Sequence, residues 1–283
     1  MEKSEPMLIP LLAGGLGNQL FQIAATYAFS RETKVDIMIK KGLFVGCGMG
    51  CRPEKYHNTI YSKFIVTDET STTCVKEHKW IYHEILPEIH EALVSHKIVL
   101  LDGYWQSEKY FEKYKGDLIN LLRPTNVVTW LQYYSFVFSK YPELYDTSNA
   151  CFIGVRRGDY IDRAHIHNPC GMDYYRKAME KVNAQVYYIA STDMDWCKKN
   201  FVGDQYKFLE IENEIELFYT MMLFQKYIIS NSSFYWWGSY LSIHDNPIVI
   251  APDKWMGGKD AKWEEYYTIY RPEMVVVERE IEV

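Results

Sequence analysis

The chain has 283 residues, 48% of them hydrophobic and 24% charged, which is the composition of an ordinary globular protein with about two domains. Its formal net charge of −6 argues against a surface that neutralises many phosphates, so no nucleic-acid partner is expected. The N-terminus lacks the pattern of a signal peptide, and no apolar run is long enough to cross a bilayer. We therefore expect a cytoplasmic protein with no integral membrane segment.

Six cysteines are expected to be free, mostly buried thiols in that compartment. Cys47 and Cys51 lie close together, but no further cysteine or histidine pair completes a zinc set, so no metal site is predicted.

The first half of the chain opens as a βαβ unit. The apolar run 7–13 predicts a strand, Gly14–Gln19 a glycine turn, and the apolar spacing from Leu20 to Tyr27 a helix. Leu20 stands where a dinucleotide fingerprint needs a small residue, so an NAD site is not expected. Residues 97–102 predict another strand, whereas the elements between residues 40 and 91 cannot be ordered.

In the second half, predicted strands alternate with predicted helices. The strands cover residues 151–155, 186–190, 227–230 and 247–251; the helices cover residues 173–183 and 213–225 and begin again near residue 234. This alternation predicts an α/β fold with a parallel sheet covered on both faces. Turn-forming residues around 141–150 place the expected domain boundary there, giving domains of residues 1–147 and 148–283.

Polar clusters follow three of these strands directly: Arg156–Asp159, Ser191–Asp193 and Asn231–Ser233. Ligands of open parallel sheets bind in the crevice beyond the carboxyl ends of the strands, so the three clusters predict one binding site.

Arg156 and Arg157 favour an anion site, because the guanidinium fork matches phosphate oxygens. One of them would face the crevice and its neighbour the interior, with Asp159 orienting a guanidinium. The alternative is a surface salt-bridge cluster. The stretch Asn231–Ser233 starts a helix whose backbone N–H groups favour phosphate, although a plain helix cap is equally compatible. Together the two clusters predict a diphosphate clamp that needs no metal.

Other polar residues offer weaker alternatives. The Asp-x-Asp sequence Asp193-Met194-Asp195 is the one feature that favours a metal-dependent transferase. We prefer the interpretation that these residues cap a helix, because a loop after a strand often carries aspartates for capping. Candidates for acid–base chemistry are Asp159, Asp162, His165, His167 and Glu108, each with a structural or solvated alternative. No nucleophilic triad is visible, so covalent catalysis is not predicted.

Four segments, taken together and in this order, resemble the motifs of the α-1,2-fucosyltransferases of glycosyltransferase family 11. They are residues 14–22 (GGLGNQLFQ), 103–111 (GYWQSEKYF), 156–160 (RRGDY) and 231–238 (NSSFYWWG), and the likeness extends to residues 250–255.

The resemblance implies a GT-B architecture, with two Rossmann-like domains facing across a cleft. The N-terminal domain would face the acceptor, and the C-terminal domain would bind GDP-fucose. It implies transfer with inversion to a hydroxyl group, typically the 2-hydroxyl of a terminal galactose of a glycan, with no metal or cofactor. By the family pattern, Arg156 contacts the β-phosphate, Asn231–Ser233 assist at the diphosphate, and His167 lies in a family-like segment. Combined with the residue patterns above, this gives three sets of expected site residues. The catalytic set is Arg156, His167 and, as an orienting residue, Asp159; the donor-binding set is Arg156, Arg157, Asp193, Asn231, Ser232 and Ser233; and the acceptor-side set is Gly15, Gly17, Asn18, Gln19, Trp105 and Gln106.

Two residues depart from the family pattern. Gly154 stands where the family usually has histidine, and Tyr235 where it usually has serine. The missing histidine leaves open a transferase for another nucleotide sugar. A non-catalytic sugar- or nucleotide-binding module is a further alternative.

Overall fold

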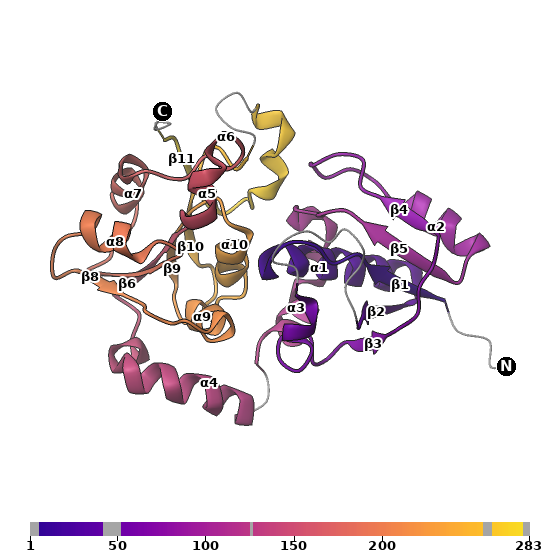
Figure 1. Ribbon diagram of the computed structural model, residues 1–283, viewed down its shortest axis with the longest axis horizontal. Coiled ribbons are helices and arrows are strands. Elements are labelled where there is room, and N and C mark those ends of the chain that lie inside the picture. The colour runs from indigo at the N-terminus through magenta and orange to yellow at the C-terminus, as the bar shows by residue number, and fades with distance from the viewer. Residues whose placement is uncertain (1–5, 42–51, 125–126, 257–261, 280–283) are drawn as a thin grey trace. The chain divides into compact units, whose positions relative to one another are not determined.

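The computed structural model describes residues 6–41, 52–124, 127–256 and 262–279 and divides into two compact units (Figure 1). The first unit comprises residues 1–123 and 264–271, and the second comprises residues 124–263 and 272–283. Each contains one parallel sheet with helices, which confirms the predicted α/β class with two Rossmann-like units. No helix within the described residues is both long enough and apolar enough to cross a membrane.

The first unit is built on a five-stranded parallel sheet in the order β3-β2-β1-β5-β4. The strands are β1 (Met7–Pro10), β2 (Asp36–Lys40), β3 (Ile65–Thr67), β4 (Cys74–Lys76) and β5 (Ile98–Asp102). Its helices are α1 (Leu16–Thr33), α2 (Leu86–Ser95) and α3 (Lys115–Leu122), with short 3-10 turns η1 (Pro53–Tyr56), η2 (Glu108–Tyr110), η3 (Glu112–Tyr114) and η6 (Tyr267–Ile269). The predicted opening strand, turn and helix are confirmed, as is the strand before residue 103.

Helix α1 is buried around most of its circumference, including polar side chains that bond to the backbone around it. Gln22 accepts from the N–H of Ala13 at 2.9 Å and donates to the carbonyl of Gly103 at 3.1 Å. One buried amide therefore links the segments that follow β1 and β5.

The second unit is built on a six-stranded parallel sheet in the order β11-β10-β9-β6-β7-β8. The strands are β6 (Ala150–Val155), β7 (Val186–Ser191), β8 (Tyr206–Phe208), β9 (Lys226–Ile229), β10 (Ile248–Pro252) and β11 (Met274–Val277). The helices are α4 (Val127–Lys140), α5 (Gly158–Asp162), α6 (Ala164–His167), α7 (Met172–Met179), α8 (Met194–Asn200), α9 (Glu214–Met221) and α10 (Ser233–Tyr240), with the 3-10 turn η4 (Pro142–Tyr145). The 3-10 turn η5 (Trp263–Glu265) begins in this unit and ends in the first. The four predicted strands and the predicted helices are confirmed to within a few residues.

Strand β6 is buried along its whole length because helices cover both faces of the sheet. Ile153 belongs to a core cluster with Tyr175 of α7, whereas Phe152 packs against Tyr235 of α10 with ring centres 5.8 Å apart. A strand covered in this way needs a continuous apolar run, which is why the sequence reveals it clearly.

The two units differ from the expected domains in two places. Helix α4 precedes residue 148 but packs with the second unit, where the Tyr134 hydroxyl donates to the carbonyl of Tyr219 at 3.1 Å. Residues 264–271 return to the first unit, where Thr268 Oγ1 accepts from the N–H of Tyr82 at 2.9 Å. Buried contacts, rather than the turn-rich stretch near residue 147, set these boundaries.

Candidate active site

Strands β9, β6 and β7 are neighbours, and their carboxyl ends bring the predicted polar clusters together. The N–H of Ser230 donates to the carbonyl of Gly154 at 3.0 Å, and the N–H of Arg156 donates to Ser230 Oγ at 3.1 Å. On the other side, the N–H of Arg157 donates to Thr192 Oγ1 at 3.2 Å. The prediction that these clusters share one edge of the sheet is confirmed.

Arg156 is the more accessible of the two arginines, with 32% of its side chain exposed. Its Nη2 lies 2.9 Å from Asp159 Oδ1, and its guanidinium carbon lies 5.2 Å from the centre of the Tyr160 ring. Its Nε is buried and has no hydrogen-bond partner among the described residues. The expected ion pair with Asp159 is therefore present and holds the guanidinium at the sheet edge.

Arg157 points inward, with only 12% of its side chain exposed. Its Nε lies 3.5 Å from Asp193 Oδ2, and its guanidinium carbon lies 4.1 Å from the centre of the Trp196 ring. Asp193 also caps α8, because its Oδ1 accepts from the N–H of Trp196 at 3.1 Å. Asp193 thus has the capping position favoured from the sequence. Within the described ranges, no group of three His, Cys, Asp or Glu residues is placed to hold a metal ion.

Asn231 lies behind the start of α10 and is only 2% exposed. Its amide nitrogen donates to the carbonyl of His167 and, at 2.9 Å, to that of Trp255, while its Oδ1 accepts from Cys170 Sγ at 3.7 Å. The side chain therefore ties three loops together, and both of its donors are used within the protein. The Asn231 amide group therefore has no donor left for a diphosphate, and the predicted contact falls to Ser232 and Ser233 at the start of α10.

Ser232 and Ser233 form that helix start. Ser232 is buried and precedes the first turn of α10, and Ser233 is half-buried at its first position. The Ser232 side chain makes no capping hydrogen bond, unlike that of Asp193 in α8. Their contact with a diphosphate stays a prediction.

His167 is half-buried beside Arg156. Its ring stacks on that of Tyr160, with centres 4.1 Å apart and planes inclined by 12°, and the Tyr160 hydroxyl donates to the carbonyl of Asn231 at 3.3 Å. Burial lowers the pKa of His167, so its imidazole is neutral at pH 7. A neutral imidazole accepts protons, so His167 keeps its candidacy for acid–base chemistry.

The other acid–base candidates have simpler surroundings. Asp162 and His165 are exposed, and Glu108, in the first unit, pairs with Lys115 at 3.9 Å.

Gly154 and Tyr235, the two departures from the family pattern, lie in direct contact in the core of the second unit. A Cβ atom at Gly154 would lie 2.5 Å from Cγ of the Tyr235 ring, closer than real Cβ contacts come. The buried Tyr235 hydroxyl bonds to the carbonyls of Val155 and Ala190, both at 3.3 Å. Tyr235 therefore fills the space where a side chain at 154 would begin, and it braces the ends of β6 and β7.

The predicted acceptor residues of the first unit are only partly accessible. Gln106 Nε2 donates to Asn18 Oδ1 at 2.9 Å at the ends of β5 and β1, and Gly15 is exposed before α1. Gln19, in contrast, is fully buried and accepts from the Tyr61 hydroxyl at 3.0 Å.

Gly17 is buried in the first turn of α1. Trp105 is fully buried and packs edge-on against Phe29, with ring centres 5.6 Å apart, so the structure corrects its expected place at the surface. Trp105 has a φ of 54°, an uncommon left-handed backbone conformation for a bulky residue.

Glu77 follows β4 at this same edge and was not identified from the sequence. Its Oε2 accepts from the N–H of Tyr104 at 2.7 Å and from that of Trp105 at 3.0 Å. Burial raises the pKa of Glu77 to about 7. Perturbed carboxyl groups of this kind cluster at functional sites, so Glu77 joins the candidate residues.

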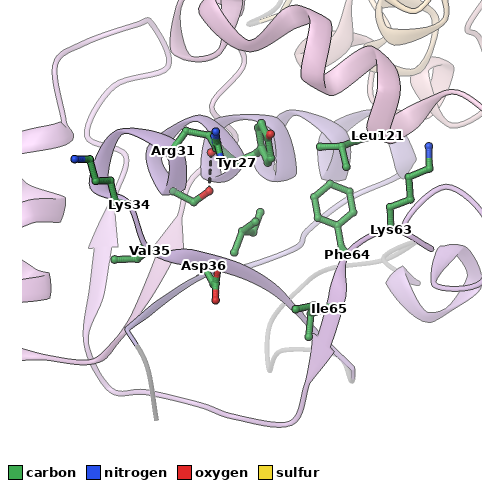
Figure 2. Close-up of a pocket in the computed structure, with 11 residues that line it drawn as sticks. Tyr27, Arg31, Lys34, Val35, Asp36, Lys63, Phe64, Ile65 and Leu121 are labelled. Atoms are coloured by element: carbon green, nitrogen blue, oxygen red, sulfur yellow. Dashed lines mark hydrogen bonds between the residues drawn. The ribbon is translucent and has the colours of Figure 1, made fainter. Parts of the chain in front are cut away.

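A cavity of about 550 Å³ in the first unit lies apart from these residues (Figure 2). Tyr27, Arg31 and Lys34 of the α1 region line one side, and Asp36 and Ile65 line the other. Asp36 and Ile65 are the first residues of β2 and β3, so this cavity lies at the amino ends of the strands. It is therefore at the opposite edge of the sheet from Glu77 and Asn18.

Two curated relatives from Escherichia coli match most of the chain. An α-1,2-colitosyltransferase is 29% identical over 276 residues, covering 88% of this chain and 92% of the relative. The O-antigen biosynthesis glycosyltransferase WbnK is 25% identical over 288 residues, covering 88% of this chain and 95% of the relative.

Solved structures show weaker similarity. The fucosyltransferase NodZ from Bradyrhizobium matches with a TM-score of 0.48 and 11% identity, covering 83% of this chain and 93% of that chain. A family 9 glycosyl transferase from Veillonella parvula matches with a TM-score of 0.49 and 9% identity, covering 99% of this chain and 87% of that chain.

The sequence profile of glycosyl transferase family 11 matches residues 11–278. The match includes the strand-end clusters of the second unit and the carboxyl edge of the first. The chain therefore belongs to glycosyl transferase family 11.

Proposed function

We propose that this chain transfers fucose from GDP-fucose to a hydroxyl group of a glycan, the 2-hydroxyl of a terminal galactose. The observation that supports this most is the accessible Arg156 guanidinium, which Asp159 holds at the carboxyl edge of a parallel sheet, while the Arg156 backbone N–H bonds to Ser230 shortly before α10. In a family 11 glycosyltransferase, such a site suits the diphosphate of a nucleotide sugar.

In the proposed reaction, the acceptor oxygen attacks the anomeric carbon of fucose from the face opposite the diphosphate. The bond from that carbon to the phosphate oxygen breaks, and GDP leaves with the bonding electrons. Negative charge then develops on the β-phosphate, where Arg156 would stabilise it. Because the guanidinium is already held in place before the reaction, it can stabilise this charge without any rearrangement of the site.

The neighbours of Arg156 have supporting roles in this scheme. Asp159 orients the guanidinium through their ion pair, and Arg157, paired with Asp193, fixes the end of β6 beside α8. The acceptor hydroxyl must lose its proton, and neutral His167 is the group of this cluster suited to take it.

The proposal is tested by measuring GDP release from purified protein across a panel of GDP- and UDP-sugars, with and without galactosides. We expect release from GDP-fucose that increases when a galactoside is present, together with a fucosylated product. GDP binding with no release in the presence of any acceptor would instead indicate a non-catalytic binding module.

A second candidate donor is nucleotide-activated colitose. The 29% identical α-1,2-colitosyltransferase favours it, and Gly154 marks a difference from the family pattern next to the donor arginines. Faster turnover with the colitosyl donor than with GDP-fucose in the same panel would establish this alternative.

We also propose that transfer needs no metal ion. The accessible Arg156 guanidinium offers fixed cationic N–H donors to a diphosphate at the sheet edge, which is the kind of stabilisation that a divalent cation would otherwise bring. Treatment with excess chelator is expected to leave the transfer rate unchanged. A rate that falls and is restored by added Mg²⁺ or Mn²⁺ would contradict this.

A further inference from the structure

We propose that the first unit binds one pyranose ring of the acceptor glycan in a small pocket where β4 and β5 end, between an aromatic pair and the Glu77 carboxylate. The pocket, here called the β4–β5 pocket, is lined by residues 76–80 and 102–104. This inference rests on the proposed transfer reaction, because it concerns the sugar that receives the donor's residue.

The aromatic part of the pocket is formed by Trp80 and Tyr104. Their rings are stacked, with centres 5.5 Å apart and planes inclined by 18°, and Trp80 is 56% exposed. One face of a pyranose ring is made of C–H groups, which pack on an aromatic face while the hydroxyl groups stay free to hydrogen-bond. A tryptophan held flat by a partner and still open to solvent offers such a face.

The polar part of the pocket is the Glu77 carboxylate. Its Oε2 is fixed by the backbone N–H groups of Tyr104 and Trp105, and no described residue donates a hydrogen bond to Oε1. A Cβ atom at Gly103 would lie 2.4 Å from the Cβ and 2.9 Å from Oε2 of Glu77, so a side chain at 103 would displace Glu77 from this position. The loop is therefore built around one anchored oxygen, which leaves the other to accept from a sugar hydroxyl.

The size and charge of the pocket fit a single sugar. Its volume is about 200 Å³. This is below the roughly 300–1,000 Å³ of pockets that enclose drug-sized ligands, and it suits one ring better than a nucleotide. Lys76 and Asp102 pair across it at 3.6 Å and supply further hydrogen-bonding groups.

Replacing Trp80 by alanine tests the aromatic face, and its exposure means that the fold should survive. We expect the KM for the acceptor to rise at least tenfold, while the KM for GDP-fucose and its slow hydrolysis without acceptor stay unchanged. Trp80→Phe should restore most of the acceptor affinity. Trp263→Ala, which removes another exposed tryptophan outside the pocket, is the matched control.

If Trp80→Ala keeps an acceptor KM within twofold of the wild-type value, the proposal that this pocket binds the acceptor is wrong. Failure of the proposed function looks different, because the wild type itself would then transfer no fucose. In that case, saturation-transfer NMR with a methyl galactoside still decides: signal in the wild type and none in Trp80→Ala supports the pocket, and equal or absent signals in both reject it.

Glu77→Gln tests the carboxylate separately. Glutamine keeps an oxygen for the two backbone N–H groups but cannot ionise. Because burial raises the pKa of Glu77 to about 7, the stronger acceptor, the carboxylate, forms between pH 6 and 8. The wild-type acceptor KM should fall across that range, and the variant's should be higher and independent of pH. If the acceptor KM of the wild type and that of Glu77→Gln depend on pH in the same way, Glu77 does not bind the acceptor.

Discussion

Arg156→Ala is expected to lower the turnover of fucosyl transfer by about 10²–10³-fold, the typical loss when one donor to a developing negative charge is removed. The guanidinium is the accessible cation at the end of β6, and Asp159 already holds it in place. Alanine leaves the departing diphosphate without that charge, while the inward-facing Arg157 keeps its contacts with Asp193 and Trp196. The measurement is GDP release with GDP-fucose and a galactoside at saturating concentrations.

The fold should be almost unaffected by this change. Asp159 is 60% exposed, and an exposed ion pair contributes only about 0–1 kcal/mol to stability. Arg156→Lys keeps the charge but not the planar fork, so we expect an intermediate rate. Arg176→Ala removes an exposed arginine of α7 in the same unit and should leave the rate unchanged. Near-normal transfer by Arg156→Ala would show that the phosphate assignment is wrong.

The second unit was predictable because its strands are covered on both faces. The apolar stretch before Arg156 has no polar interruption, and the clusters begin where burial ends. Parallel pairing of β9, β6 and β7 then brings those clusters together without any further assumption. Here the local pattern and the tertiary structure coincide.

The first unit was less predictable because its edge strands are too short to show periodicity. Strand β4 has three residues, so nothing in the sequence marks Glu77 as the residue that follows a strand. Its role depends on backbone N–H groups 27 and 28 positions further along the chain, which only the folded structure supplies.

The sequence also could not predict the direction in which a side chain points. Trp105 was expected to face a ligand, but its left-handed backbone accompanies a buried ring. Asn231 was expected at a phosphate, but its amide bonds to loop carbonyls behind the helix. In both cases the position at the sheet edge was right, and the tertiary contacts decided which way the side chain points.

Gly154→Ala is expected to destabilise the protein by about 1–3 kcal/mol, the usual cost of forcing extra atoms into a packed core. The added Cβ would lie 2.5 Å from the Tyr235 ring, which is itself buried and bonded to the ends of β6 and β7. Neither the strand nor the ring can move without disturbing the carbonyl of Val155, next to Arg156. Urea unfolding monitored by circular dichroism measures the effect.

A double-mutant cycle with Tyr235→Ser separates this clash from any general cost of alanine in a strand. Tyr235→Ser alone should cost about 3–5 kcal/mol through the cavity that it leaves. In the Tyr235→Ser background, Gly154→Ala should change the free energy of unfolding very little, because the aromatic ring that the added Cβ would meet is absent. The coupling free energy between the two positions should therefore be about 1–3 kcal/mol. Gly154→His with Tyr235→Ser, the pair that the family resemblance implies, should then be more stable than Gly154→His alone. An equal cost of Gly154→Ala in both backgrounds would show that the two departures are independent, and the packing of Tyr235 would no longer explain the glycine.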